Sequence, residues 1–209
     1  VPLPRATRSG TLTGGTAQAL VAGAKAFTAL QMDTAGDFTI QAADGVLTAA
    51  TSGTINAAVV YSGAGTFALI TSAADVTDGY YVLVNSGDTV AMNRTNTVGT
   101  YFTNEAVTVS GGTIVNPNTS IVWLLQTNAT YGGHTIYNEA AAKYASFSGA
   151  ANAAFAADAV TGTTGVWTFA YASSVFTVAN KADASRYLAY NSASPRFACY
   201  TTGQQKLHL

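Results

Sequence analysis

Short apolar runs separated by turn residues recur along the chain and predict β-strands. Between residues 36 and 70, apolar residues and threonines alternate in short runs that are bounded by Asp44-Gly45, Ser52-Gly53 and Gly63. Short strands at regular spacing, with glycine in the turns between them, are typical of a small β-sandwich or barrel. We therefore predict a β-sandwich or barrel over residues 16–77, which we expect to act as an anchoring domain.

The first part of the chain is less regular. In residues 16–31 the alanines favour a helix, whereas the alternation from Leu20 to Thr28 suits a strand and Gly23 weakens a helix. We favour strands there. Residues 1–15, with their prolines and glycines, predict an extended arm. A terminal arm becomes ordered only through contacts, so we expect it to pack on its own domain or on a neighbouring subunit.

A spacing is repeated three times between Asp78 and Leu209. Three short apolar strands each end on an asparagine, a phenylalanine follows 17 positions later, and a bulky apolar residue closes the unit. The landmarks are Asn85, Phe102 and Trp123 in the first unit, Asn138, Phe155 and Trp167 in the second, and Asn180, Phe197 and Leu207 in the third. Internal repeats of this kind indicate that one structural unit is built several times.

Three units of about 40 residues, each with several short strands, predict a β-trefoil over residues 78–209. This fold closes its strands into a barrel and so leaves few open edges. We expect Leu83, Ile136, Val178 and the three closing residues to face the barrel, and the three phenylalanines to form a symmetric layer. The asparagines are expected to form turns by bonding nearby backbone. The first unit is longer, and we place its extra residues in the loop 107–120.

Charge is scarce, which limits the possible partners. Charged residues make up 9% of the chain, with nine basic and ten acidic side chains, against about 25% in typical soluble domains. So few cations cannot neutralise a phosphate backbone, so nucleic acid is not an expected partner. The apolar runs are far shorter than the roughly 20 residues that span a bilayer. Low charge with many hydroxyl and amide side chains fits an extracellular or virion surface, although an alanine-rich host composition would also explain it.

The last residues carry a resemblance to a known domain. The segments Tyr187-Leu-Ala-Tyr-Asn191, Pro195-Arg-Phe-Ala-Cys-Tyr200 and Lys206-Leu-His-Leu209 resemble the closing repeat of a domain in large secreted proteins of Bacteroidetes. The rhythm of tyrosine and tryptophan is similar in plan to ricin-type trefoil lectins. Their sugar sites depend on an early Asp and on Gln-x-Trp, which Ser120-Ile-Val-Trp123 and Thr164-Gly-Val-Trp167 do not match. The resemblance therefore implies the scaffold of residues 78–209 and no sugar site.

The chain offers no recognisable catalytic or metal-binding motif. Its two histidines, His134 and His208, have no second ligand nearby in the sequence, and Cys199 is its single cysteine. Hydrolysis by acid and base needs two placed carboxylates, and the two glutamates, Glu105 and Glu139, lie in no such context. We expect no catalytic residues, no metal and no cofactor.

The candidate binding residues are aromatic. Tyrosine has a flat apolar face and a hydroxyl, which suits sugars and protein interfaces. Tyr131, Tyr144, Tyr187 and Tyr190, beside Asn191, fall near expected hairpin turns, so we name them as ligand-binding candidates. The alternative is that these rings fill the core and the caps of the barrel.

Two functions fit these patterns. The first is a non-catalytic surface protein, such as a virion decoration or fibre protein or a cell-surface assembly component, that displays the trefoil for adhesion or glycan contact. Its partners would be copies of itself or a shell or fibre protein, bound through the N-terminal part. The alternative is a secreted bacterial carbohydrate-binding module.

Overall fold

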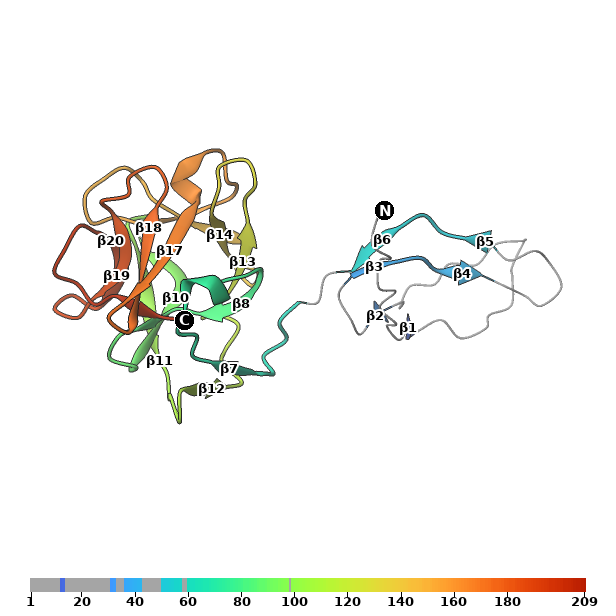
Figure 1. Cartoon of the computed structure of the whole chain (residues 1–209), viewed down its shortest axis with the longest axis horizontal. Coiled ribbons are helices and arrows are strands. Elements are labelled where there is room, and N and C mark those ends of the chain that lie inside the picture. The colour runs from blue at the N-terminus through green and yellow to red at the C-terminus, as the bar shows by residue number, and fades with distance from the viewer. Residues whose placement is uncertain (1–11, 14–30, 33–35, 43–49, 58–59, 98) are drawn as a thin grey trace. The chain divides into compact units, whose positions relative to one another are not determined.

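The computed structural model describes residues 12–13, 31–32, 36–42, 50–57, 60–97 and 99–209 of the chain. Its contacts divide the chain into two compact units, Val1–Val60 and Tyr61–Leu209. Figure 1 shows the strands of both units. The expected arm at residues 1–15 falls outside the described residues except for Leu12 and Thr13, as does most of the ambiguous stretch 16–31.

The described part of the first unit consists of short antiparallel strand pairs. The pairs are β1 (Leu12–Thr13) with β2 (Gln31–Met32), β3 (Gly36–Phe38) with β6 (Ile55–Ala57), and β4 (Gln41–Ala42) with β5 (Ala50–Thr51). The expected turn at Asp44-Gly45 lies outside the described residues. The described residues of this unit thus form strands, as the alternation predicts.

The second unit contains the longer strands. They are β7 (Thr66–Ala68), β8 (Gly79–Val82), β9 (Val84–Asn85), β10 (Val90–Thr97), β11 (Tyr101–Ala106), β12 (Thr113–Val115), β13 (Val122–Thr127), β14 (His134–Asn138), β15 (Lys143–Ser146), β16 (Phe155–Ala157), β17 (Trp167–Ala172), β18 (Val175–Asn180), β19 (Tyr187–Asn191), β20 (Arg196–Tyr200) and β21 (Leu207–His208). Two single-turn 3-10 helices, η1 (Ala73–Asp75) and η2 (Thr163–Gly165), interrupt them.

Thirteen of these strands form one antiparallel sheet that closes on itself. The closed path runs from β18 through β19, β20, β11, β10 and β9 to β21, which pairs with β18 again. Closure removes the exposed strand edges that an open sheet would leave. The predicted all-β fold with a C-terminal β-trefoil is confirmed.

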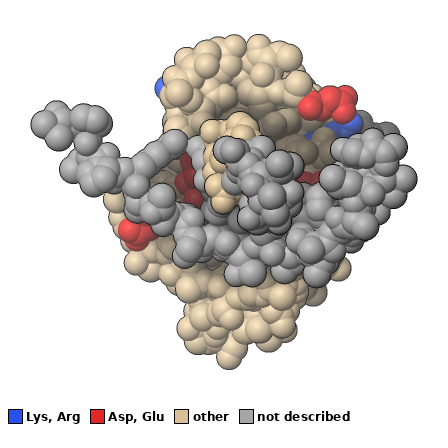
Figure 2. All heavy atoms as spheres, turned by 90° about the vertical axis from the view of Figure 1, so that its right-hand side faces the viewer, with Lys and Arg blue, Asp and Glu red and all other residues tan. Residues whose placement is uncertain are grey.

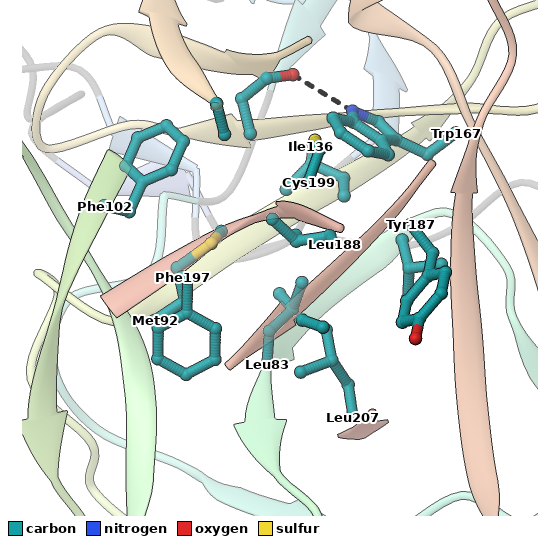
Figure 3. Close-up of a cluster of buried hydrophobic side chains, with 14 of the residues drawn as sticks. Leu83, Met92, Phe102, Ile136, Trp167, Tyr187, Leu188, Phe197, Cys199 and Leu207 are labelled. Carbon is teal, nitrogen blue, oxygen red and sulfur yellow. Dashed lines mark hydrogen bonds between the residues drawn. The ribbon is translucent and has the colours of Figure 1, made fainter. Parts of the chain in front are cut away.

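The core lies inside this closed sheet. Leu83, Ile136 and Val178 are fully buried in one apolar cluster, as their equivalent places in the three units require. Figure 3 shows part of this cluster, with side chains from all three units packed together. The equivalent apolar residues of the three units therefore pack in one cluster. This shared environment explains why the repeat is visible in the sequence.

The closing residues of the three units are buried as well. Trp123, Trp167 and Leu207 are at most 1% exposed. The indole N–H of Trp123 donates to the carbonyl of Met92 (2.9 Å), and that of Trp167 donates to the carbonyl of Ala145 (3.0 Å). The second of these bonds is the dashed line in Figure 3. Met92 lies on β10 and Ala145 on β15, and each of these strands directly follows the strand that ends on the asparagine of its unit. The two tryptophans therefore make equivalent bonds in the two units.

The phenylalanine layer is less symmetric than the spacing suggests. Phe102 and Phe197 are fully buried and face each other where β11 pairs with β20. Phe155 is only half-buried and lies outside the core cluster, whereas its neighbour Ala154 is fully buried in it. The expected layer of three phenylalanines is therefore corrected to two, because the second unit turns a small alanine towards the core.

The three asparagines at the strand ends are buried, with at most 2% of their surface exposed. Their Oδ1 atoms accept backbone N–H groups a few residues further on: Val90 for Asn85, Ala141 for Asn138 and Ala182 for Asn180. This is the local turn bonding that asparagine favours.

Their Nδ2 atoms reach much further, to the end of another unit. Asn138 donates to the carbonyls of Thr119 (3.1 Å) and Val122 (2.9 Å), just before the closing Trp123. Asn180 donates to the carbonyl of Thr164 (2.8 Å), just before Trp167. Asn85 donates to the side chain of Gln205 (2.6 Å), just before Leu207. Each asparagine thus joins the start of one unit to the end of another.

The segment after Tyr61 belongs to the second unit because the long loop of the first repeat holds it. The extra residues at 107–120 contain β12, which pairs along its whole length with β7, and Figure 1 shows the two strands side by side. The Oδ1 of Asn116 also accepts the N–H of Gly65 (2.8 Å). The division of the chain thus falls after Val60, and residues 61–77, expected in the anchoring domain, pack with the trefoil.

Candidate functional site

A polar groove of about 430 Å³ lies on the second unit. Its walls come from the β13–β14 hairpin, from β15, from the loop that follows β16 and from the residue before β8. The lining residues are Asp78, Gln126, Thr127, Asn128, Thr135, Tyr144, Asp158, Ala159 and Val160. Carboxylate, amide, hydroxyl and aromatic groups are thus gathered in one hollow.

Hydrogen bonds fix one side of the groove. The Oδ1 of Asp78 accepts both the backbone N–H and the hydroxyl of Thr127, each at 2.6 Å. The Oδ1 of Asn128 accepts the backbone N–H of Tyr131 (3.0 Å) and so shapes the hairpin loop. Gln126, just before them, is exposed. This edge therefore combines held polar groups with an amide that is open to solvent.

The opposite side carries an aromatic ring and a carboxylate. Tyr144 is half-buried, and its ring packs at a tilt of 41° against that of Tyr137, with the ring centres 4.6 Å apart. The side chain of Asp158 is 86% exposed and forms an ion pair with Lys143. A held aromatic ring beside accessible hydrogen-bonding groups can bind a ligand that has both an apolar face and hydroxyls.

Two of the sequence-based candidates are not available to a ligand. Tyr187 and Tyr190 are 9% and 7% exposed and belong to the core cluster. The ring of Tyr190 packs against that of Phe197, with the centres 5.0 Å apart, and Figure 3 shows Tyr187 among the core side chains. Assigning these two tyrosines to a binding surface is therefore wrong, because both faces of β19 are covered.

The other candidates are spread over the surface. Tyr144 lines the polar groove, whereas Tyr131 is half-buried in the β13–β14 loop and does not line it. Asn191 ends β19, and its Oδ1 accepts the N–H groups of Ala193 and Ser194, as in an ordinary turn. The structure brings Tyr187, Tyr190 and Asn191 onto one strand but does not join them to Tyr144.

The polar residues that line the groove with Tyr144 were not predicted from the sequence. The apolar run that begins at Ile121 is followed by the polar residues Gln126 and Asn128. This change from apolar to polar residues indicates that the strand ends at the solvent. Asp78 and Asp158 carry no such signal, because they reach the groove only through the pairing of β8 with β13 and of β15 with β16.

The glutamates have structural partners. The Oε2 of Glu105 accepts the side chains of Asn93 (2.7 Å) and Ser120 (2.6 Å). The Oε2 of Glu139 accepts the hydroxyl of Tyr80 (2.9 Å). Burial, together with this bond, raises the pKa of Tyr80 to about 12. Both carboxylates thus accept hydrogen bonds from neighbouring side chains of the second unit.

Other reactive groups are also enclosed or dispersed. Cys199 is fully buried, and burial raises the pKa of its thiol to about 12. The ring of His134 packs edge-on against Phe169, and His208 bonds Asp88. Among the described residues, no cluster of three or more His, Cys, Asp or Glu side chains could hold a metal ion.

The described surface is sparsely charged, and Figure 2 shows only small basic and acidic patches on the face it presents. Within the described ranges, the structure has no helix that combines the length and the apolar character needed to cross a membrane.

No protein-family model matches the chain, and no curated protein matches its sequence. Solved structures match it in fold. A mosquitocidal holotoxin matches 64% of the chain with a TM-score of 0.52 at 11% identity. An endo-β-galactosidase from Clostridium perfringens that releases GlcNAcα1-4Gal matches 62% with a TM-score of 0.51 at 8% identity.

A lectin from Polyporus squamosus, bound to a human-type influenza-binding epitope, matches 64% of the chain with a TM-score of 0.51 at 13% identity. The chain spans only 17%, 31% and 49% of the holotoxin, the galactosidase and the lectin, respectively. At these identities the likeness concerns the fold alone. The chain is thus similar in fold to parts of these three larger proteins.

Proposed function

We propose that the chain is a non-catalytic carbohydrate-binding protein whose polar groove on the trefoil receives a glycan. The observation that carries the proposal is the position of Tyr144 beside Gln126 and Asp158 in that groove. A sugar ring has an apolar face that packs on an aromatic side chain, and hydroxyls that bond amides and carboxylates. The fold likeness to a lectin agrees with this proposal.

One groove of this size binds a sugar weakly, so display in several copies would raise the overall affinity. We place the protein on a surface outside the cell or on a virion, as a decoration, fibre-like or assembly component held through its N-terminal part. The low charge of the chain supports this placement, because weak repulsion lets copies stand close together. A secreted bacterial carbohydrate-binding module is the alternative, supported by the resemblance of residues 187–209.

Replacing Tyr144 by alanine tests the groove. We expect the full chain to bind members of a glycan array, and Tyr144→Ala to weaken that binding at least about tenfold, because the stacking surface is lost. Tyr144→Phe keeps the ring and should retain most of the affinity. Tyr131→Ala, which changes a tyrosine just outside the groove, serves as the matched control. Binding that survives Tyr144→Ala in a folded protein would place the site elsewhere, and no binding to any glycan would refute the function.

Removing residues 1–15 tests the display part of the proposal. Because the arm is proposed to join neighbouring copies, we expect light scattering to show a defined oligomer for the full chain and a monomer for the shortened chain. A monomer in both cases would contradict assembly through the arm and favour the secreted module.

A further inference from the structure

A second hollow of about 460 Å³ lies on the same unit, and all its walls belong to residues 61–209. One wall is formed by the segment from Tyr61 to Ile70, and the other by β8, β9 and the end of the chain. Its lining includes the aromatic side chains of Tyr61, Phe67, Tyr80 and Tyr81. A volume in this range suits a small molecule.

The wall at residues 61–70 is firmly attached. The hydroxyl of Tyr61 donates to the carbonyl of Pro117 (2.6 Å), and β7 pairs with β12 throughout. At the far end of the segment, the N–H of Ile70 donates to the carbonyl of Leu209 (2.9 Å). The hollow is therefore preformed, which lowers the entropic cost of binding.

Aromatic rings surround this hollow. Tyr61 meets Phe67 edge-on, with ring centres 5.4 Å apart, and lies 6.0 Å from Tyr80 at a tilt of 45°. Tyr81 also lines the hollow. The hydroxyls of Tyr61 and Tyr80 are used by Pro117 and Glu139, so these two tyrosines contribute neutral rings to the wall.

The charged groups of the hollow are acidic. Among the described lining residues, Asp78 and Asp88 carry carboxylates, His208 is the single imidazole, and none is Lys or Arg. His208 Nδ1 lies 2.7 Å from the Oδ1 of Asp88, and Asp78 uses its Oδ1 for Thr127. Within the described part of the chain, these bonds engage the Oδ1 atoms of the two aspartates and leave each Oδ2 able to face a ligand.

We propose that this hollow binds a small quaternary or methylated ammonium group. Aromatic faces attract such cations through the quadrupole of the ring, and the attraction grows where water is partly excluded. Two carboxylates without a lining Lys or Arg add attraction for a cation and disfavour an anion. Asp78 lines both this hollow and the polar groove, whereas Asp88 and the aromatic rings of Tyr61 and Phe67 line the hollow alone. The proposal does not depend on glycan binding in the groove.

Choline and its neutral isostere 3,3-dimethylbutan-1-ol distinguish charge recognition from simple apolar filling. We expect choline to shift the NMR resonances of residues around the hollow of the full chain in a saturable way. Its affinity should exceed that of the neutral alcohol by roughly tenfold, as cation–π attraction would give. Equal affinities, or no saturable shift, would overturn the proposal.

Two substitutions locate the effect. Phe67→Leu keeps an apolar side chain but removes a ring, so we expect a clear loss of choline affinity. Asp88→Asn removes a charge at a residue with φ of +56°, a conformation that asparagine tolerates, so the fold should persist. Asp88→Asn should lower the affinity for choline several-fold and leave the affinity for the neutral alcohol unchanged. Asp158→Asn in the polar groove is the control, and an equal effect there would mean general charge attraction and refute the site.

Discussion

Replacing Trp167 by alanine should lower the free energy of unfolding of the trefoil by about 3–5 kcal/mol, which is the usual cost of deleting a large aromatic side chain from a core. Trp167 is fully buried, so the substitution leaves a cavity that the surrounding strands cannot fill. It also removes the indole N–H that bonds the carbonyl of Ala145, leaving that acceptor without its partner.

Denaturant unfolding followed by the fluorescence of the remaining Trp123 measures this loss, because both tryptophans belong to the second unit. Val115→Ala is the control. Val115 is 63% exposed, so its truncation should change the free energy of unfolding by less than about 0.5 kcal/mol. A loss below about 1 kcal/mol for Trp167→Ala would contradict the position of this residue in the core.

Replacing Asn138 by alanine should lower the free energy of unfolding by about 2–3 kcal/mol, although the side chain is small. Asn138 is fully buried, and its amide serves the carbonyls of Thr119 and Val122 as well as the N–H of Ala141. Alanine would leave the buried carbonyl of Val122 and the half-buried groups of Thr119 and Ala141 without this partner, and an unsatisfied buried group carries its full desolvation penalty.

Asn191→Ala is the matched control, since that asparagine bonds two backbone N–H groups at a turn where water can replace it. We expect its cost to stay below about 1 kcal/mol in the same denaturant experiment. If the two substitutions cost the same, the asparagines act only as turn formers, and their links between units add nothing.

The sequence predicted the trefoil well because a closed barrel places equivalent residues in equivalent surroundings. For that reason an apolar residue recurs at the equivalent positions of Leu83, Ile136 and Val178, and a tryptophan recurs at the end of the first two units. The pairing of β7 with β12 left no such signal. It joins segments far apart in the chain and occurs only once, so the sequence did not show that the segment around β7 packs with the trefoil.

The binding residues were harder to predict. A tyrosine with a buried ring looks the same in sequence as one with an exposed ring, and Tyr187 and Tyr190 lie on a strand that is covered on both faces. Alternation cannot separate inside from outside on such a strand. Tyr144 was predicted as a ligand-binding candidate, and it lines the polar groove. Asp78 and Asp158, which line the groove with it, could not be predicted because they come together through strand pairing alone.

The three long-range asparagine bonds bear on cooperativity. Asn85 takes its partner from the last unit, Asn138 from the first and Asn180 from the second, so the links run once around the barrel. A single unit cut out of the chain would hold a buried amide without its acceptors. None of the three is therefore a self-sufficient folding module, and the trefoil should be lost in one step rather than unit by unit.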